Sequence, residues 1–393
     1  MSKIIAITGN GAMAEAMRQI NPDVVAAFPI TPSTQVIEDF SKFVADGKVD
    51  TELVTVESEH SAMSACIGAS VAGGRVMTAT SSQGLALMWE MLYIAASMRQ
   101  PVLLTVVNRA ISAPINIHCD HGDSMGARDA GWIQFYAENN QEAYDNMIMA
   151  PVIGENIDIR LPVMVAMDGF IISHGIETMQ IEDDQKVRDF IGEHTTLNCL
   201  LDTDNPVTWG ALDLHDYYIE HRRGQQAAMD KVKSVVEEVS KKFGEEFGRE
   251  YGLFESYRLD DADRAVVAIN SVAGEIKEVI DELRELGEKV GMLKIRLFRP
   301  FPYTEIAEAL KGCKIVTVMD RSTSMGAYGP LFSEISNALY DAEAKPLLYN
   351  RTYGLGGREM LLDDIKDVFK ESEEYLSNGK VEKMFDFLNV RGD

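Results

Sequence analysis

The sequence predicts an α/β protein whose first unit is a doubly wound parallel sheet and whose second, smaller unit repeats the same alternation. Over roughly the first 180 residues, short apolar runs alternate with segments of helical length, which is typical of a parallel sheet covered by helices on both faces. The alternation resumes at about residue 265 after a long polar stretch. A chain of 393 residues is also too long for one typical domain, so we expect two or three.

The composition is that of an ordinary globular protein, with 46% hydrophobic and 25% charged residues. The formal net charge of −25 gives a surface that repels nucleic acid and anionic membranes, so we expect neither as a partner. The sequence enters an apolar strand directly and has no apolar run of membrane-spanning length, so we expect no signal peptide and no membrane span. The four cysteines form no CxxC pair, which indicates a reducing, cytoplasmic setting and no iron–sulfur cluster held by this chain alone.

The elements of the first unit follow from the alternation, in chain order. We expect strands at residues 3–8, 22–28, 53–56, 75–80, 101–107 and 161–167, and helices at 12–20, 33–46, 59–71, 84–97 and 141–149. The first strand is expected to be buried, and the sixth to be the last clear strand of this unit. The turn Gly9-Asn10-Gly11 resembles the start of a dinucleotide fingerprint, but Ala14 stands where the third glycine belongs, so a tight strand-to-helix turn is favoured.

The second half begins with an irregular segment at residues 180–222, followed by a long helix at 224–250. An apolar stripe along that helix favours packing across a domain boundary, with partner binding as the alternative. After a linker at 252–263 we expect strands at 265–269, 290–297 and 314–319, and helices at 273–286 and 303–311. Gly354–Gly357 is expected to be a plain turn rather than a phosphate cradle, because no Lys-Ser/Thr follows it. Residues 371–393 are expected to form a surface helix with a frayed end.

Three polar turns follow apolar strands of the first unit, and they contain Thr31, Glu59 and Ser82-Gln83-Gly84. Because a parallel sheet places such turns at the carboxyl edge of its strands, where ligands bind, we expect these residues to converge. Glu59 begins a nearly uncharged helix, so its carboxyl group should be poorly solvated and able to share a proton with a bound base. A helix-capping role is the alternative for Glu59, and Glu57 is the competing carboxylate.

The polar segment at residues 108–131 follows a buried strand directly, a position more often functional than filler. Arg109 is suited to clamp a substrate carboxylate, and a surface ion pair with Asp120 or Asp123 is the alternative. Asp120, His121 and Asp123 are a weak metal signal, so we expect structural or supporting roles for them. His60 and His174 are expected to be partly buried histidines with satisfied hydrogen bonds.

Several separate motifs resemble one known family over roughly the first 180 residues. These are Phe28-Pro29-Ile30-Thr31-Pro32, Glu57-Ser58-Glu59-His60-Ser61-Ala62, Ser82-Gln83-Gly84-Leu85, Asn108-Arg109-Ala110, Asp120-His121-Gly122-Asp123, Gly131-Trp132-Ile133-Gln134 and Asp168-Gly169-Phe170. They are similar in order and spacing to the α subunits of the 2-oxoacid:ferredoxin oxidoreductases, and of pyruvate:ferredoxin oxidoreductase in particular.

The resemblance implies a thiamine diphosphate enzyme. Residues 1–222 would form the pyrimidine-binding domain, 223–263 a helical linker and 264–393 a domain like the C-terminal domain of transketolase. Glu59 would hydrogen-bond the pyrimidine ring of the cofactor, with Pro29, Ser82 and Gln83 lining the site, and Thr31 and Arg109 would bind the substrate. Since no motif for a Mg²⁺–diphosphate site is evident, a partner chain would hold that half of the cofactor.

The reaction implied is the conversion of pyruvate, coenzyme A and oxidised ferredoxin to acetyl-CoA, CO₂ and reduced ferredoxin. The resemblance also implies a β subunit with Mg²⁺ and a [4Fe-4S] cluster, a γ subunit, and a ferredoxin-like δ subunit with further clusters, arranged as a dimer of heteromers. A branched-chain 2-oxoacid, 2-oxoglutarate or oxalate is the alternative substrate. A non-catalytic scaffold subunit is the alternative from another class, although a scaffold needs none of Glu59, Thr31 and Arg109.

Overall fold

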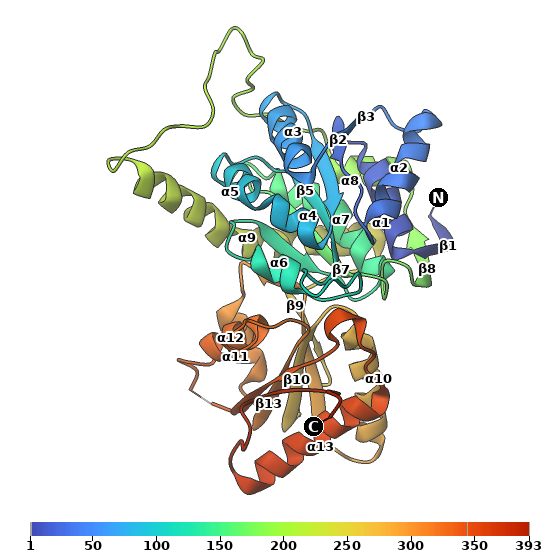
Figure 1. Ribbon diagram of the computed structural model, residues 1–393, viewed down its shortest axis with the longest axis vertical. Coiled ribbons are helices and arrows are strands. Elements are labelled where there is room, and N and C mark those ends of the chain that lie inside the picture. Colours follow the sequence, from blue (N-terminus) through green and yellow to red (C-terminus); the bar gives the residue numbers. More distant parts are fainter. Residues whose placement is uncertain (1, 344, 393) are drawn as a thin grey trace.

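The computed structural model describes residues 2–343 and 345–392, which fold into two α/β units, one above the other in Figure 1. The N-terminal sheet has seven strands, and its neighbours are parallel except for the antiparallel pair β12–β6. Its strands are, in spatial order, β12 (Leu297–Arg299), β6 (Ile133–Tyr136), β7 (Val163–Asp168), β5 (Leu103–Asn108), β4 (Val76–Thr80), β2 (Val24–Ala27) and β3 (Glu52–Thr55).

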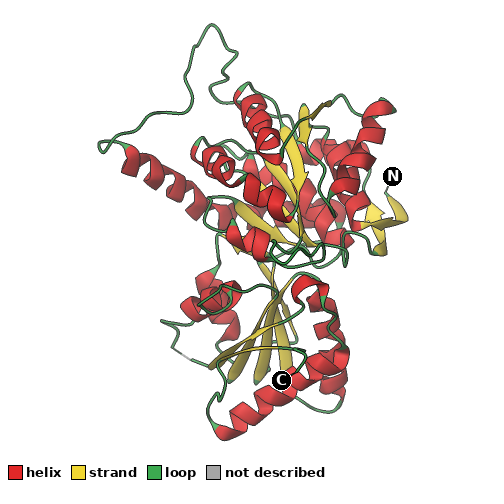
Figure 2. Cartoon of the chain, viewed as in Figure 1, coloured by secondary structure: helices red, strands yellow, loops and turns green. Residues whose placement is uncertain are grey.

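Helices cover both faces of this sheet, which confirms the doubly wound arrangement (Figure 2). One face packs against α1 (Gly9–Ile20), α2 (Thr34–Ala45), α7 (Asn140–Gly154), α8 (Asp184–Ile191) and α9 (Tyr218–Phe247). The other packs against α3 (Glu59–Val71), α4 (Ser82–Leu87), α5 (Trp89–Ser97) and α6 (Gly122–Gly126). Adjacent residues of a strand supply opposite cores, as Leu103 and Leu104 of β5 do, because side chains alternate along a strand.

The second sheet has six strands, of which only β9 runs antiparallel to its neighbour. In spatial order they are β15 (Phe385–Phe387), β14 (Leu347–Thr352), β13 (Ile315–Asp320), β10 (Arg264–Ile269), β11 (Val290–Ile295) and β9 (Phe254–Tyr257). The helices beside it are α10 (Val272–Glu285), α11 (Tyr303–Leu310), α12 (Pro330–Ala338) and α13 (Leu362–Asn378), with a short 3₁₀ turn η1 (Leu355–Gly357) after β14. None of the described helices is both long and apolar enough to cross a membrane.

The carboxyl ends of the two sheets meet. Asp168, the last residue of β7, accepts hydrogen bonds from Asn270 and Ser271, which directly follow β10. It also pairs with Arg321, which directly follows β13, at 2.7 Å. Residues at the carboxyl edge of one parallel sheet therefore contact residues at the carboxyl edge of the other, and the polar segment after β5 lies in this junction.

The N-terminal strand departs from the sequence-based expectation. β1 (Lys3–Thr8) is not a buried strand of the main sheet, because it pairs antiparallel with β8 (Ile176–Ile181) in a separate two-stranded sheet. Three of its six residues are exposed, with Ile4 at 74%, and the other three are partly buried. Of this strand, only Ile5 and Ile7 pack on the core. The apolar run is therefore buried on one face, whereas the sequence analysis expected burial on both faces. β8 also shows that the strand at 161–167 is not the last of this unit.

Short strands account for most of the other differences. β6 was not expected, and β12 of the second half joins the first sheet beside it. The expected linker at 252–263 contains β9, and the expected frayed tail contains β15, which pairs in parallel with β14; residue 393 of that tail lies outside the described residues. The expected helix at 84–97 is divided at Met88 into α4 and α5.

The long helix α9 begins at Tyr218, earlier than expected. Its apolar stripe includes Val232 and Val236, which are fully buried. The helix packs on α7 and α5 of the first unit, and its Lys233 pairs with Glu305 of α11 in the second unit at 2.6 Å. Residues 192–217, which lead into α9, are irregular as expected. Thr196, Cys199 and Leu200 still bond to the end of α3 and the turn after it, and the loop that follows extends away from the body of the molecule in Figure 1.

Candidate active site

Glu59 is a buried carboxylate at the start of α3. The helix begins there because the Ser58 side chain accepts a hydrogen bond from the Ser61 backbone N–H at 3.2 Å, which caps the first turn. Glu59 is 6% exposed, and within the described residues its carboxylate has no hydrogen bond or ion pair. Glu57 is exposed and accepts a hydrogen bond from the Ser61 hydroxyl at 2.6 Å. Glu59 is therefore the carboxylate with unused hydrogen-bonding capacity in a poorly solvated place.

The turn between β4 and α4 lies against Glu59. Gly84 makes this approach possible, because a Cβ there would lie 2.7 Å from Glu59 Oε1. Three buried polar atoms of the turn have no hydrogen-bond partner among the described residues: Thr80 Oγ1, Ser81 Oγ and Gln83 Nε2. Buried polar groups are nearly always paired in a complete assembly, so this cluster fits a polar ligand or another chain.

Ser82 supports the turn from inside. It is fully buried at φ 48°, and its hydroxyl donates to the Ala110 carbonyl at 2.6 Å. Its backbone N–H donates to Asp123 Oδ2 at 2.9 Å. The Ser82 hydroxyl thus has a hydrogen-bond partner within the chain, whereas the side-chain Nε2 of Gln83 has none among the described residues.

Arg109 follows β5 and is 7% exposed. Its Nη1 donates to the Thr31 carbonyl at 2.9 Å and its Nε to the Asn116 carbonyl at 3.3 Å. Asp123 receives the Arg109 backbone N–H rather than the guanidinium, at 3.0 Å. The alternative of an ion pair with Asp120 or Asp123 is therefore wrong. The guanidinium has no carboxylate partner among the described residues, which leaves its charge available to an anion.

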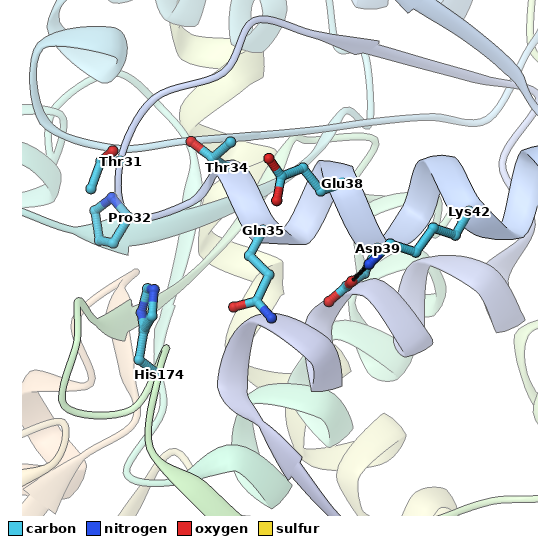
Figure 3. Close-up of a pocket in the computed structure, with 8 residues that line it drawn as sticks. All are labelled: Thr31, Pro32, Thr34, Gln35, Glu38, Asp39, Lys42 and His174. Atoms are coloured by element: carbon cyan, nitrogen blue, oxygen red, sulfur yellow. Dashed lines mark hydrogen bonds and ion pairs between the residues drawn. The ribbon is translucent and has the colours of Figure 1, made fainter.

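Thr31 and Pro29 lie in the exposed turn after β2. Thr31 contributes to an open pocket of about 360 Å³ between this turn and α2 (Figure 3). The pocket is lined by Thr31, Pro32, Thr34, Gln35, Glu38, Asp39, Lys42 and His174. The Lys42 ammonium pairs with Asp39 at 2.6 Å, so the pocket offers no surplus positive charge. The Thr31 backbone carbonyl accepts a hydrogen bond from Arg109. Pro29 makes no polar contact within the described part of the chain.

Asp123 has the structural role that was expected for it. The buried carboxylate accepts hydrogen bonds from the Asn108 side chain and from the backbone N–H groups of Ser82, Arg109 and Ser124. Burial nevertheless raises the pKa of Asp123 to about 6, because desolvation outweighs these bonds. This one side chain fixes the turn before α4 and the residue that carries the guanidinium.

Cys119, His121 and Asp168 form the one group of described residues whose ligand atoms lie close enough to hold a metal ion, within 4.8 Å of one another. The guanidinium of Arg321 already lies 2.7 Å from Asp168 Oδ2, and His121 Nε2 lies 2.6 Å from Asp168 Oδ1. A cation would be repelled by Arg321, so we interpret the cluster as an ion-pair network. Sequence analysis singled out His121 but missed Asp168 and Arg321 as partners, because 153 residues separate them.

The two histidines that were expected to be partly buried with satisfied hydrogen bonds lie at the margins of the site; His60 is partly buried, and His174 is exposed. The His174 ring lies 2.8 Å from the Ser173 hydroxyl and stacks on Phe170, and burial lowers the pKa of His174. His60 lies 3.7 Å from Glu90 at the surface. Neither contacts Glu59 or Arg109 through a hydrogen bond.

Two family models match the chain. Residues 15–241 match the model described as "Pyruvate flavodoxin/ferredoxin oxidoreductase, thiamine diP-bdg". Residues 262–365 match "Pyruvate:ferredoxin oxidoreductase core domain II". The first match ends within α9, and the second begins two residues before β10.

Curated relatives are similar over nearly the whole chain. The pyruvate synthase subunit PorA of Thermotoga maritima is 55% identical over 94% of this chain and 94% of its own length. The PorA subunit of Methanocaldococcus jannaschii is 48% identical over 95% of this chain and 96% of its own length. The ketoisovalerate oxidoreductase subunit VorA of Pyrococcus abyssi is 42% identical over 98% of this chain and 97% of its own length.

Two solved structures share the fold. The 2-oxoglutarate:ferredoxin oxidoreductase of Magnetococcus marinus superposes with a TM-score of 0.73 at 20% identity, over 94% of this chain and 65% of that chain. A split-gene transketolase superposes with a TM-score of 0.53 at 12% identity, over 94% of this chain and 97% of its own. The two matched models and the relatives above 40% identity show that this chain belongs to the pyruvate:ferredoxin oxidoreductase family.

Proposed function

We propose that this chain is the α subunit of a pyruvate:ferredoxin oxidoreductase and supplies the pyrimidine side of a thiamine diphosphate site together with the clamp for the substrate carboxylate. The reaction converts pyruvate, coenzyme A and oxidised ferredoxin to acetyl-CoA, CO₂ and reduced ferredoxin. The observation that carries the proposal is the buried Glu59 carboxylate, which has no partner among the described residues and lies against Gly84.

The residues around Glu59 fit the aminopyrimidine half of this cofactor. A ring with nitrogen donors and acceptors needs a carboxyl partner in a dry site and further polar groups at its edge. The unpaired atoms of Thr80, Ser81 and Gln83 supply that edge, and Gly84 leaves room beside the carboxylate. When bound, thiamine diphosphate supplies the nucleophile and the electron sink for decarboxylation of a 2-oxoacid.

Glu59 holds and transfers a proton at the cofactor ring in this proposal. Its carboxyl group is nearly buried beside Gly84, where it can exchange a hydrogen bond with a ring nitrogen of the cofactor. A positioned carboxyl group of this kind contributes roughly 10²–10⁴-fold to a proton-transfer step. Gln83, with its free amide nitrogen, and Pro29 would line the cofactor, while Ser82 holds the turn in place.

Arg109 binds the substrate carboxylate, with Thr31 beside it. A guanidinium already fixed by two carbonyl groups is oriented before the substrate arrives, which lowers the entropic cost of binding. Its unpaired charge matches the single carboxylate of pyruvate, and a planar guanidinium suits a bidentate contact. Thr31 adds a hydroxyl at the edge of the same turn.

Other chains complete the enzyme in this proposal. The relatives are named as subunits, and the unpaired groups at the α3–α4 edge leave one side of the site to another chain. We assign the diphosphate, Mg²⁺ and a [4Fe-4S] cluster to a β subunit, and further clusters to a ferredoxin-like δ subunit, with a γ subunit also present. The assembly would be a dimer of heteromers in the cytoplasm that passes electrons to ferredoxin.

The test compares Glu59→Gln with Glu57→Gln in the assembled complex. The amide of E59Q can still form a hydrogen bond but cannot transfer a proton, so hydrogen exchange at C2 of the bound thiamine ring should slow by roughly 10²–10⁴-fold. E57Q alters an exposed carboxylate and should exchange at the rate of the unmodified complex. Exchange is followed by NMR. An unchanged rate in E59Q would move the role to another group.

A further inference from the structure

We propose that the glycine turn Gly354–Gly357 of the second unit is a positioning element for Arg109, acting through the loop at residues 110–119. The second unit would then take part in binding the substrate carboxylate, although none of its side chains touches the substrate. This inference rests on the proposed role of Arg109 as the carboxylate clamp. It also gives a role to a glycine motif that sequence analysis treated as a plain turn.

The loop that orients Arg109 has little support of its own. The Arg109 Nε donates to the Asn116 carbonyl at 3.3 Å, so the position of that carbonyl determines where the guanidinium points. The loop exposes Ile111, Ile115 and Ile117 to solvent. Across its base, the Ala110 N–H bonds the His118 carbonyl at 3.0 Å. A loop with so few buried contacts needs an external support to hold one conformation.

The glycine turn supplies that support with two hydrogen bonds. The Asn116 side-chain amide donates to the Gly356 carbonyl at 3.0 Å. The Gly357 N–H donates to the Cys119 carbonyl at 3.0 Å. On the other side of its amide, Asn116 Oδ1 accepts the His118 N–H at 2.7 Å. The Asn116 side chain therefore ties the loop to the turn and closes the loop on itself.

Only glycine permits this approach. Gly356 and Gly357 have φ values of 62° and 78°, which favour glycine. A Cβ at Gly357 would lie 2.5 Å from the Cβ of His118, and a Cβ at Gly356 would overlap the Asn116 amide nitrogen. A larger residue at either position must therefore displace the loop that carries the carbonyl bound by Arg109.

The glycine turn packs against Arg321, which belongs to the buried junction between the two sheets. A Cβ at Gly354 would lie 3.0 Å from Nε of Arg321, whose guanidinium pairs with Asp168 across the junction at 2.7 Å. The Arg321 carbonyl accepts the His121 N–H at 2.8 Å, just beyond the loop. The chain of contacts from the second unit to Arg109 is thus continuous, and it passes through Asn116.

The experiment uses the purified complex with G357A and N116A, and with G379A as the matched control. Gly379 has φ 67° and no atom within 4 Å of an added Cβ, so G379A has the same kind of backbone strain without a clash. G357A and N116A should raise the KM for pyruvate about 10-fold, a part of the ~10²-fold that a misplacement of about 1 Å can cost. Both should leave kcat within about 2-fold and the KM for coenzyme A unchanged, since only the carboxylate clamp is moved. G379A should resemble the unmodified complex.

A second readout does not depend on turnover. Amide hydrogen exchange of residues 110–119, measured without substrate, should accelerate in G357A and N116A and stay unchanged in G379A. Unchanged KM values in G357A and N116A, beside a raised KM in R109M, would overturn the proposal and leave the clamp intact. An equal loss in kcat and in every KM would also overturn it, because it indicates general damage. An unchanged KM in R109M would overturn the clamp and this inference together.

Discussion

Arg109 keeps a nearly buried positive charge that no carboxylate among the described residues neutralises. Such a charge is costly to maintain, because carbonyl dipoles replace only part of its hydration. An anion that binds to Arg109 neutralises this charge. The unpaired guanidinium therefore destabilises the isolated chain but strengthens substrate binding. Glu59 is likewise a nearly buried carboxyl group without a partner among the described residues. The two groups follow β3 and β5 at the same edge of the sheet, with β2 and β4 between those strands.

Replacing Arg109 by methionine should raise the KM for pyruvate sharply. The substitution keeps an unbranched apolar side chain but removes the charge, and loss of one partner of a buried charge pair costs roughly 2–5 kcal/mol. Steady-state kinetics of the complex measure the effect. Arg128→Met is the control, because Arg128 lies at the surface, 3.9 Å from Asp129. Equal KM values for the two variants would show that another group binds the carboxylate.

At the scale of elements, the junction between the two sheets depends on Asp168. The carboxyl end of β7 in the first sheet meets the carboxyl ends of β10 and β13 in the second sheet. Asn270, Ser271 and Arg321, which follow β10 and β13, therefore reach the Asp168 carboxylate. Burial alone would raise the pKa of Asp168, but the charges of Arg321 and His121 and the hydrogen bonds from His121 and Ser271 hold it well below its usual range. The Asp168 carboxylate is therefore ionised at neutral pH, and both of its oxygens accept hydrogen bonds.

Asp168→Asn should lower the free energy of unfolding by about 3–5 kcal/mol, because it leaves Arg321 as a buried charge without its partner. Urea denaturation of the purified chain, followed by circular dichroism, measures the difference. Asp367→Asn, an exposed aspartate on α13, should change the same quantity by less than about 0.5 kcal/mol. Similar midpoints for both variants would show that the network does not stabilise the junction.

The difference in unfolding free energy between the unmodified chain and D168N should depend on pH in one direction. A carboxylate whose pKa is lowered on folding stabilises the folded state above its ordinary pKa, and this contribution is lost as pH falls toward the folded value. The gap between the unmodified chain and D168N should thus be constant from neutral pH down to about 5 and shrink below about pH 4. A gap that persists unchanged to pH 2 would contradict ionisation of Asp168 as the source.

The sequence predicted elements whose pattern is local and missed those that depend on distant partners. Strands β4, β5 and β7 are apolar and buried on both faces, and each was expected. β9, β12 and β15 have three or four residues each, too few for a period to be recognised. Their positions come from pairing with strands far along the chain.

The candidate site divides in the same way. The common edge position of Glu59, Thr31 and Arg109 could be predicted because each follows an apolar strand, and topology places such positions on one edge; their roles in the site stay predictions. The Asp168 network could not, since its partners Asn270 and Arg321 are 102 and 153 residues away. The support that Asn116 gives to Arg109 was also invisible, because it depends on a backbone carbonyl in an irregular loop.

At the scale of the whole molecule, the cysteines bear on where the iron–sulfur clusters of the proposed complex are held. Cys66, Cys119 and Cys313 are buried, and Cys199 is partly exposed. Burial raises the pKa of Cys66 to about 12 and that of Cys313 to about 11, which disfavours the thiolates that ligate iron. Clusters would therefore belong to partner chains.

The purified chain alone should be colourless and should not oxidise pyruvate, whereas the complex should be brown and active. Iron and acid-labile sulfide analysis of both preparations, made anaerobically, is the measurement. Stoichiometric iron and sulfide in the single chain would show that this subunit binds a cluster, and the assignment of clusters to partner chains would then be wrong.

In the proposed site one guanidinium, that of Arg109, selects a substrate with one carboxylate. Arg128 lies 3.9 Å from Asp129 and Lys42 pairs with Asp39, so neither offers a free second charge. A dicarboxylate would leave one charge unpaired in a dry site, which is costly.

The most direct test is steady-state kinetics of the complex with pyruvate, 2-oxobutyrate, 3-methyl-2-oxobutanoate, 2-oxoglutarate and oxalate. We predict the highest kcat/KM for pyruvate, with small monocarboxylic 2-oxoacids ahead of both dianions. A higher kcat/KM for 2-oxoglutarate or oxalate than for pyruvate would contradict selection by the single charge of Arg109.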